Sequence, residues 1–297
     1  MAAKTTRRFR TFGKWILIGE HAVLRGCPAL AFPIKSRYVD VEFSHLDQPA
    51  KVFFSGPHGD EFSLLFWGLV EKALEKVGRQ RSDLLGQLSL DCYIPLGTGL
   101  GASAVLCVAV GRWFYFLGWI SKDQIYGFSQ SLEDLFHGES SGVDIAVALK
   151  GYGLCFQRSG EKTPLKLNWQ PKWYLSYSGK RGVTSGCVRQ VKNLWKEDAE
   201  RGRSLDQKMK QAVEVAQKAL SLEREKGWPL LLEAVHKANE CFSEWGLNKG
   251  ELGRHLEWLR QKGAVAIKPT GSGGGGYALS LWENEPPKVI RNRLFPA

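Results

Sequence analysis

Hydrophobic residues recur with two different periods in the first half of this 297-residue chain. Short runs rich in β-branched and aromatic residues, bounded by Gly, Pro or Asp, indicate strands, and an alternating run indicates a half-buried strand. These patterns predict strands at Lys14–Gly19, Ala29–Ile34, Tyr38–Phe43, Lys51–Ser55 and Leu88–Ile94. Apolar residues at helical spacing predict helices at Phe62–Val77, Ala102–Ile120 and Lys122–His137.

The second half of the chain has a different hydrophobic pattern, which indicates long amphipathic helices between short strands. Apolar spacing and capping residues predict helices at Leu205–Glu225, Leu230–Trp245 and Leu252–Lys262, and strands at Trp173–Tyr177, Val265–Ile267 and Tyr277–Trp282. Strands and helices are interleaved without a regular βαβ rhythm, so the pattern favours the α+β class. We expect two domains, residues 1–165 and residues 166–297, because the hydrophobic pattern changes between residues 155 and 172.

The charge of the chain is strongly positive, with a formal net charge of +11 and a pI of about 9.4. Acidic residues alternate with the basic ones on the predicted helices, and only Arg7, Arg8 and Arg10 resemble a basic arm. No zinc-finger, RRM or basic-zipper pattern is present, so we expect no nucleic-acid partner. A positive field also suits an enzyme whose small-molecule substrates are anions.

Cysteine usage and hydropathy indicate a cytoplasmic protein. The six cysteines are well separated and form no C-x-x-C pair, which favours free thiols in a reducing compartment. The N-terminus is polar and basic, without the apolar region of a signal peptide. The apolar stretch Ala102–Ile120 contains Arg112 and is slightly short for a membrane span, so we interpret it as a buried helix. The sequence does not determine the oligomeric state, and a homodimer is one option.

The segment Pro95–Ala104 joins a predicted strand to the buried helix and carries three alternating glycines. Gly97, Gly99 and Gly101 allow the backbone to approach phosphate oxygens, and the helix start supplies N–H groups and a positive dipole. A Ser103 hydroxyl in the first helical turn can reach a phosphate or its Mg²⁺. The P-loop and dinucleotide fingerprints do not fit this spacing. A glycine-rich turn that only packs a helix on a strand is the alternative.

Three further segments carry chemistry. Glu133 and His137 share a helix face, and Asp144 follows in a turn where it can act as a base toward a substrate hydroxyl. A carboxylate at Glu133 suits Mg²⁺, although a solvated helix end is the simpler reading of that segment alone. The glycine run in Lys268–Gly276 suggests close approach to a ligand, with a slack hairpin tip as alternative. Lys14 opens a strand, and a lysine there either stabilises phosphoryl charge or is simply solvated.

Taken together and in order, Gly13–Val23, Pro95–Ala104 and Lys268–Gly276 resemble the three signature motifs of the GHMP kinase family. The resemblance spans the whole chain. It implies an N-terminal domain like domain 2 of ribosomal protein S5, a ferredoxin-like C-terminal domain, and ATP with Mg²⁺ as cofactors.

The resemblance also implies a set of site residues. Lys14 and Asp144 match the catalytic pair, and Ser103 and Glu133 match the Mg²⁺ ligands. Positions implied for the acceptor are Glu20, His21, Ser141, Gly142 and Thr184. Positions implied for ATP are Pro95, Gly97, Gly99, Leu100, Gly101, Ala102, Ser103, Gly271, Gly273 and Gly274.

Within the family, Gly19–Val23 and the Ser141–Asp144 turn are most similar to the mevalonate kinase branch, which implies phosphorylation of the mevalonate 5-hydroxyl in isoprenoid precursor synthesis. Arg25 and Glu139 depart from the branch pattern, and Arg25 can meet either a carboxylate or a substrate phosphate. Phosphomevalonate kinase therefore stays as the alternative, followed by a sugar kinase. A non-catalytic, ligand-binding regulator is a third hypothesis, disfavoured because the four phosphoryl-transfer residues are all present.

Overall fold

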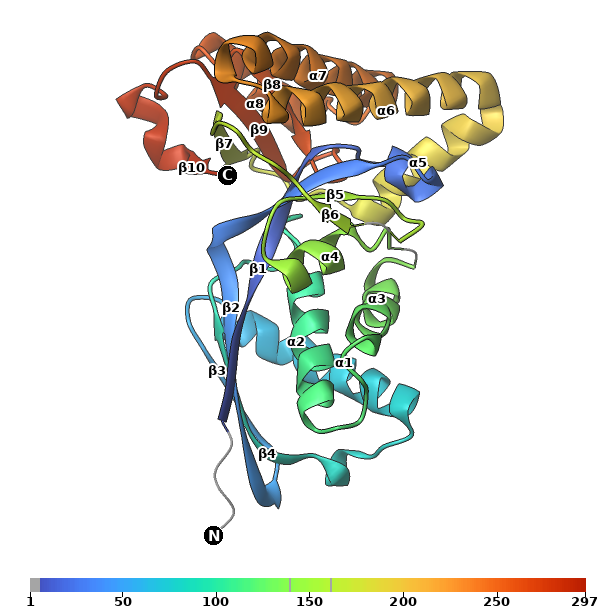
Figure 1. The fold of residues 1–297 in the computed structure, drawn as a ribbon, viewed down its shortest axis with the longest axis vertical. Coiled ribbons are helices and arrows are strands. Elements are labelled where there is room, and N and C mark those ends of the chain that lie inside the picture. Colours follow the sequence, from blue (N-terminus) through green and yellow to red (C-terminus); the bar gives the residue numbers. More distant parts are fainter. Residues whose placement is uncertain (1–5, 139, 161) are drawn as a thin grey trace. The chain divides into compact units, whose positions relative to one another are not determined.

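The computed structural model describes residues 6–138, 140–160 and 162–297, without the side chain of His137 (Figure 1). The α-helices are α1 Gly59–Val77, α2 Ala102–Phe116, α3 Gln124–His137, α4 Val143–Lys150, α5 Thr184–Glu197, α6 Ala199–Ser221, α7 Arg224–Glu244 and α8 Gly250–Gln261. The strands are β1 Thr6–Ile18, β2 Ala29–Pro49, β3 Lys51–Ser55, β4 Leu85–Cys92, β5 Leu154–Phe156, β6 Lys162–Pro164, β7 Lys172–Tyr177, β8 Ala266–Thr270, β9 Tyr277–Trp282 and β10 Phe295–Pro296. Short 3₁₀ helices are η1 Ala22–Arg25, η2 Arg81–Asp83 and η3 Lys288–Arg293.

The chain packs into two compact units that are interleaved in sequence. The first comprises the chain through Lys14, Pro33–Leu96 and Leu100–Gly151, and the second comprises Trp15–Phe32, Gly97–Gly99 and Tyr152–Ala297. Strands β1 and β2 and the glycine segment therefore each contribute residues to both units. We predicted a single boundary between residues 165 and 166, and that domain boundary stays a prediction.

In the first unit, helices cover a mixed sheet. Strand β3 pairs in parallel with β4, and β4 pairs antiparallel with β2, whose Val41 lies opposite Leu90. Aromatic residues join the sheet to the helices. The Trp113 ring of α2 lies 6.4 Å from the Phe43 ring of β2 and 6.0 Å from the Phe66 ring of α1, measured between ring centroids. Burial of these large apolar surfaces holds the unit together.

Helix α2 is buried on nearly all sides, which confirms its interpretation as a core helix. Its residues from Ala104 to Val110 are at most 3% exposed. The Arg112 guanidinium donates to the Leu149 carbonyl oxygen at 2.9 Å, so the charge that interrupts the apolar run is satisfied inside the unit. Over the described ranges, no helix combines the length and hydropathy needed to cross a membrane.

The segment that resembles a basic arm in the sequence is the beginning of strand β1. The Arg8 and Arg10 guanidinium groups pair with the carboxylates of Glu42 and Asp40 on β2, at 2.8 and 2.6 Å. Cross-strand pairs of opposite charge stabilise neighbouring strands. These two arginines are therefore engaged within the sheet.

In the second unit, a four-stranded antiparallel sheet has the order β10-β7-β9-β8. Helices α6 and α7 pack side by side in this unit (Figure 1). An apolar cluster beneath α8 includes Leu252, Leu256, Trp282 and Ile290. The first residues of β2 pair antiparallel with β5, which in turn pairs with β6.

Two helix starts in the second unit differ from the predictions. Helix α6 begins at Ala199, before the predicted start at Leu205, because the Asp198 side chain accepts the Arg201 N–H and caps the helix. Helix α7 begins at Arg224, before the predicted start at Leu230, and contains Pro229 within it. Polar first turns hid both starts from the hydrophobic pattern.

Candidate active site

The glycine segment between β4 and α2 has the backbone that its sequence predicted. Gly97, Gly99 and Gly101 have φ of 69°, 85° and 82°, values that residues with a Cβ rarely adopt. Gly101 is the N-cap of α2, which begins at Ala102 and carries Ser103 in its first turn. A helix start without a side-chain cap presents N–H groups that suit an anion.

In the first unit, the predicted catalytic pair is in direct contact. The Lys14 ammonium lies 3.2 Å from an Asp144 carboxylate oxygen, and Lys14 is 5% exposed. Gly101 faces both side chains, since a Cβ built on it would lie 3.0 Å from Lys14 Cγ and 3.6 Å from Asp144 Oδ2. The Lys14 N–H also donates to the Leu100 carbonyl oxygen at 2.8 Å, which ties β1 to the glycine segment.

Asp144 lies in the first turn of helix α4, not in the open turn that we predicted. Gly142 is the N-cap with φ of 81°, and the Tyr126 hydroxyl of α3 donates to its carbonyl oxygen at 3.3 Å. The Ser141 hydroxyl accepts the Val143 N–H at 3.3 Å. A Cβ at Gly142 would overlap the Tyr126 hydroxyl, so glycine is required here. Helix α4 thereby gives Asp144 a fixed direction.

Glu133 of α3 is buried, with 2% of its surface exposed. Burial, reinforced by the Asp144 charge, raises the pKa of its carboxyl to about 8, against the opposing charge of Lys14. A divalent cation would relieve the repulsion between the two carboxylates, so Glu133 and the Ser103 hydroxyl fit Mg²⁺ chemistry. In the described ranges no cluster of three His, Cys, Asp or Glu side chains could hold a metal alone. Phosphate and water oxygens would have to supply the other ligands.

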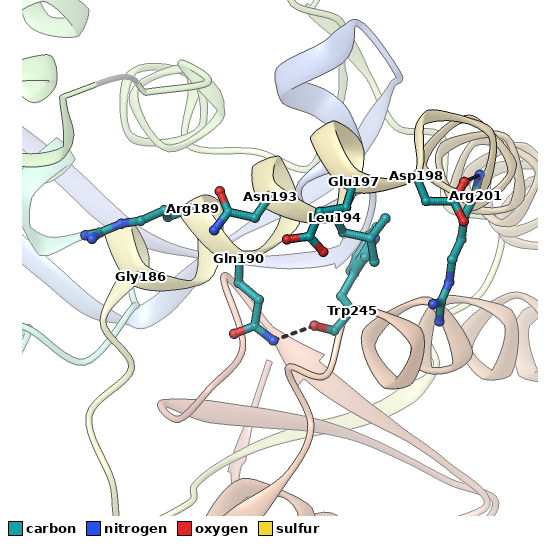
Figure 2. Close-up of a pocket in the computed structure, with 9 residues that line it drawn as sticks. All are labelled: Gly186, Arg189, Gln190, Asn193, Leu194, Glu197, Asp198, Arg201 and Trp245. Atoms are coloured by element: carbon teal, nitrogen blue, oxygen red, sulfur yellow. Dashed lines mark hydrogen bonds between the residues drawn. The ribbon is translucent and has the colours of Figure 1, made fainter.

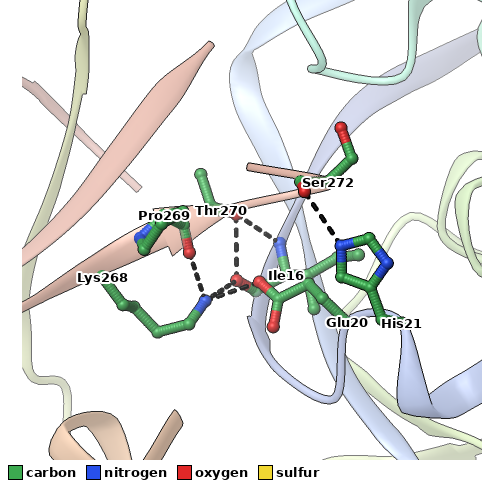
Figure 3. A network of polar contacts seen from close by, with 7 residues as sticks. All are labelled: Ile16, Glu20, His21, Lys268, Pro269, Thr270 and Ser272. Atoms are coloured by element: carbon green, nitrogen blue, oxygen red, sulfur yellow. Dashed lines mark hydrogen bonds and ion pairs between the residues drawn. The ribbon is translucent and has the colours of Figure 1, made fainter. Parts of the chain in front are cut away.

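In the second unit, Lys268 of β8 joins the third motif to the first (Figure 3). Lys268 is fully buried, and its ammonium donates to Glu20 Oε1 and to the Pro269 carbonyl oxygen, both at 2.5 Å. Thr270 Oγ1 accepts the Ile16 N–H and donates to the Ile16 carbonyl oxygen, each at 2.9 Å. These contacts fix the start of the glycine loop against the end of β1. Burial raises the pKa of Glu20, and the Lys268 charge opposes this shift.

His21 has a strained backbone and a buried ring. Its φ of 59° and ψ of −51°, with an Ala22 N–H donating to the Glu20 carbonyl oxygen at 2.6 Å, describe a γ-turn of the rare kind. Among the residues that the structure describes, it is the one non-glycine residue with positive φ. Its ring packs near Trp245 and contacts the Ser272 carbonyl oxygen at 2.9 Å through Nε2. Since a carbonyl only accepts, Nε2 carries the proton and Nδ1 is left as an acceptor.

The loop Gly271–Gly276 consists of a Ser272 within five glycines, and each glycine has positive φ. Its Ser272 hydroxyl donates to Thr184 Oγ1 at 3.4 Å, at the start of α5. The Cys187 thiol donates to the Gly273 carbonyl oxygen at 3.2 Å. The glycine run is therefore a packed loop rather than a slack hairpin tip, and it brings Thr184 beside the third motif.

Arg25 is engaged by the protein itself. Its guanidinium donates two hydrogen bonds to the Asp206 carboxylate, at 2.5 and 2.6 Å, and lies over the Trp195 ring. Bidentate pairing of this kind occupies the guanidinium. From the sequence, Arg25 could meet a carboxylate or a phosphate of a substrate, whereas in the structure its partner is Asp206, 181 positions away. Glu139 and the side chain of His137 lie outside the described residues.

A groove of about 680 Å³ runs along α5 in the second unit (Figure 2). Its lining residues are Gly186, Arg189, Gln190, Asn193, Leu194, Glu197, Asp198, Arg201 and Trp245. Trp245 is shared with the packing around His21, and its carbonyl oxygen accepts from the Gln190 amide at 2.7 Å. Two arginines and two carboxylates line the groove, so its lining favours no single charge.

Three residues beside the site motifs were not predicted: Tyr126 and Cys187, which donate to the carbonyl oxygens of Gly142 and Gly273, and Arg181, whose guanidinium lies beside Gly97. Tyr126 lies seven positions before Glu133 and so on the same face of one predicted helix, which was an available signal. Arg181 and Cys187 belong to a connection and a helix, α5, that the hydrophobic pattern did not predict. Only Cys187 and Val191 of that helix are buried, too narrow an apolar stripe to recognise.

Comparison with known proteins gives a consistent result. Residues 65–152 match the family model for the GHMP kinases N terminal domain. The chain is 30% identical over 293 residues to a mevalonate kinase of Pyrococcus horikoshii, with 90% of this chain and 86% of the relative covered. A mevalonate kinase of Archaeoglobus fulgidus is 28% identical, with 93% and 92% covered.

Solved structures with lower sequence identity share the fold. The L. major mevalonate kinase in complex with R-mevalonate superposes with a TM-score of 0.76 at 21% identity, covering 98% of this chain and 90% of that one. The Streptococcus pneumoniae phosphomevalonate kinase in complex with phosphomevalonate and AMPPNP gives 0.72 at 17% identity, covering 98% of both chains. The predicted α+β fold is thereby confirmed.

Proposed function

Because the chain belongs to the GHMP kinase family, we propose that it transfers the γ-phosphate of ATP to the 5-hydroxyl of mevalonate. The chain is a phosphotransferase of that family, and family membership implies the use of ATP. The observation that carries the proposal is the Lys14–Asp144 contact beside Gly101 in the glycine segment. It combines a base and a cation at the start of a helix that suits phosphate.

In the proposed reaction, the acceptor hydroxyl oxygen forms a bond to the γ-phosphorus while the bond to the ADP oxygen breaks. Asp144 receives the hydroxyl proton, or orients the hydroxyl for in-line attack. Lys14 keeps Asp144 in place and offsets the negative charge that develops on the transferred group. The burial of Lys14 makes its electrostatic contribution larger than it would be in water.

We assign Glu133 and Ser103 as the residues that would hold Mg²⁺ together with the nucleotide phosphates. When bound, the ion supplies charge neutralisation for the phosphates. The buried carboxyl at Glu133, whose pKa is raised by burial and by Asp144, supports this assignment.

On the acceptor side, we propose that His21, Thr184, Ser141 and Gly142 contact mevalonate. The strained backbone of His21 supports its role, because such strain is concentrated at functional sites. Glu20 was assigned to the acceptor with them, and its contact with Lys268 supports a part in positioning the first motif. The bidentate bond from Arg25 to Asp206 removes the feature that had favoured a phosphorylated acceptor.

The cellular setting follows from the same proposal. A mevalonate kinase would serve isoprenoid precursor synthesis. The six cysteines are all free, five of them buried, which supports a reducing cytoplasmic location. A homodimer stays a prediction.

The test is ATP turnover with mevalonate, phosphomevalonate, homoserine and galactose as separate acceptors. We expect turnover with mevalonate, and an Asp144→Asn variant with kcat lowered roughly 10²- to 10⁴-fold that still binds AMPPNP. Asp60→Asn, at the exposed start of α1, is the matched control and should keep full activity. Turnover with phosphomevalonate alone would refute the acceptor assignment, and near-normal activity of Asp144→Asn would refute the base.

A further inference from the structure

We propose that Arg181 binds a phosphate of the nucleotide, a role that rests on the proposed kinase function. Arg181 lies in the connection between β7 and α5, within the second unit. A Cβ built on Gly97 would lie 3.4 Å from Arg181 Nη1, 3.6 Å from Cζ and 3.8 Å from Nε. The guanidinium group therefore lies beside the first glycine of the phosphate-binding segment, where it would contact any side chain placed there.

The guanidinium is available for a ligand. Arg181 is exposed, and in the described part of the chain no carboxylate or carbonyl oxygen pairs with it. Arg10 and Arg25 are different, because each is held by an aspartate in a bidentate contact. A guanidinium fork without an acidic partner, next to a loop suited to phosphate, is complementary to phosphate oxygens.

The backbone around Arg181 is held by the third glycine motif. The Gly276 N–H donates to the Lys180 carbonyl oxygen at 2.7 Å, and the Ser178 N–H donates to the Gly276 carbonyl oxygen at 2.9 Å. A Cβ on Gly275 would lie 2.8 Å from the Arg181 carbonyl carbon and oxygen. The connection thus rests directly on the glycine loop, and glycine is needed for that approach.

The position of Arg181 favours the nucleotide over the acceptor as the source of the phosphate. Its guanidinium lies beside the glycine segment, and its backbone lies against the glycine loop. These are the two motifs assigned to ATP. Thr98 of the glycine segment also lies beside the loop, with its carbonyl oxygen 3.3 Å from a Cβ built on Gly276. A phosphate bound between these segments would be reached by one arginine and by backbone N–H groups.

The test compares Arg181→Gln and Arg181→Lys with the wild-type enzyme. For Arg181→Gln we expect the Kd of AMPPNP and the KM for ATP to rise about 10- to 30-fold, with the acceptor KM changed less than about twofold. Arg181→Lys keeps the charge and should recover part of the affinity. Arg189→Gln, which removes an exposed arginine that lines the groove on α5, is the matched control and should bind AMPPNP normally (Figure 2).

The outcomes separate this inference from the proposed function. AMPPNP binding needs no acceptor, so it tests Arg181 even if mevalonate is not the substrate. Wild-type affinity for AMPPNP in both Arg181 variants would overturn the inference. An increase confined to the KM of mevalonate or phosphomevalonate would also overturn it, because the guanidinium would then bind the acceptor.

Discussion

His21 illustrates how a single residue can combine backbone strain with a suppressed charge. Burial lowers the pKa of its imidazole to about 4, and the Ser272 carbonyl oxygen only partly opposes this shift. The ring is therefore neutral at physiological pH, with Nε2–H donating and Nδ1 free to accept. A neutral acceptor suits a substrate hydroxyl better than an imidazolium would.

The lowered pKa of His21 predicts an acid-sensitive contribution to stability. The unfolded chain takes up a proton near pH 6.5 while the folded chain does so only near pH 4, so folding loses up to about 3 kcal/mol as pH falls through that window. His21→Gln removes this titration, and its free energy of unfolding should therefore fall less between pH 6.5 and 4 than that of the wild type. Urea unfolding at several pH values measures the two slopes. Parallel slopes would show that His21 does not titrate in this range.

For single residues, the sequence predicted some side-chain contacts and not others. Lys14 and Asp144 were paired because they match the catalytic pair of the family that the motifs resemble, and the structure places them in contact. The partner of Arg25 was not predictable, because Asp206 lies on a distant amphipathic helix where its carboxylate looked like a solvated charge. A local sequence pattern indicates what chemistry a side chain can do. Which distant side chain it pairs with depends on how the helices and strands pack, and the local pattern does not contain that information.

Secondary-structure elements were predicted well where buried apolar residues recur at a regular spacing along the sequence. Strand β3 and strand β9 were predicted to the residue, and helices α1 and α2 to within a few. Helices α4 and α5 were missed, α4 because it has only eight residues after a glycine turn and α5 because its buried stripe is narrow. These two helices carry Asp144 and Thr184. The elements whose hydrophobic pattern is weakest therefore carry two of the proposed site residues.

Strand β8 and the turn that follows β1 are linked by the buried Lys268–Glu20 pair, which predicts strong coupling between two substitutions. Lys268→Met leaves Glu20 buried without its ion-pair partner and should cost about 3–5 kcal/mol of unfolding free energy. Adding Glu20→Gln removes the orphaned charge and should restore at least about 1 kcal/mol. Urea denaturation of both single variants and the double variant gives the coupling energy. Additive losses would mean that the pair does not act as a unit.

At the scale of the whole molecule, the net charge of +11 takes on a specific meaning. Many of the basic residues are neutralised locally, as Arg8 and Arg10 are on the β1–β2 pair. Arg181 is a basic residue beside a glycine motif that has no such neutralising partner in the described ranges. The positive field therefore fits an enzyme for anionic small molecules, as composition suggested. The charge available to an anionic ligand comes from the few basic residues, such as Arg181, that are not neutralised locally within the described residues.

Ligand binding at this site should stabilise the whole chain, and the effect should depend on Glu133. At about 100 times its Kd, AMPPNP with Mg²⁺ should add about 2.7 kcal/mol and raise the unfolding midpoint by roughly 5 °C or more. Removing Mg²⁺ with EDTA should abolish much of this increase in the wild type, whereas Glu133→Gln should show the smaller increase with or without the metal. The exposed Glu75→Gln variant should behave as the wild type does. Calorimetry without an acceptor measures each midpoint, and a full Mg²⁺-dependent increase in Glu133→Gln would exclude this carboxylate as a metal ligand.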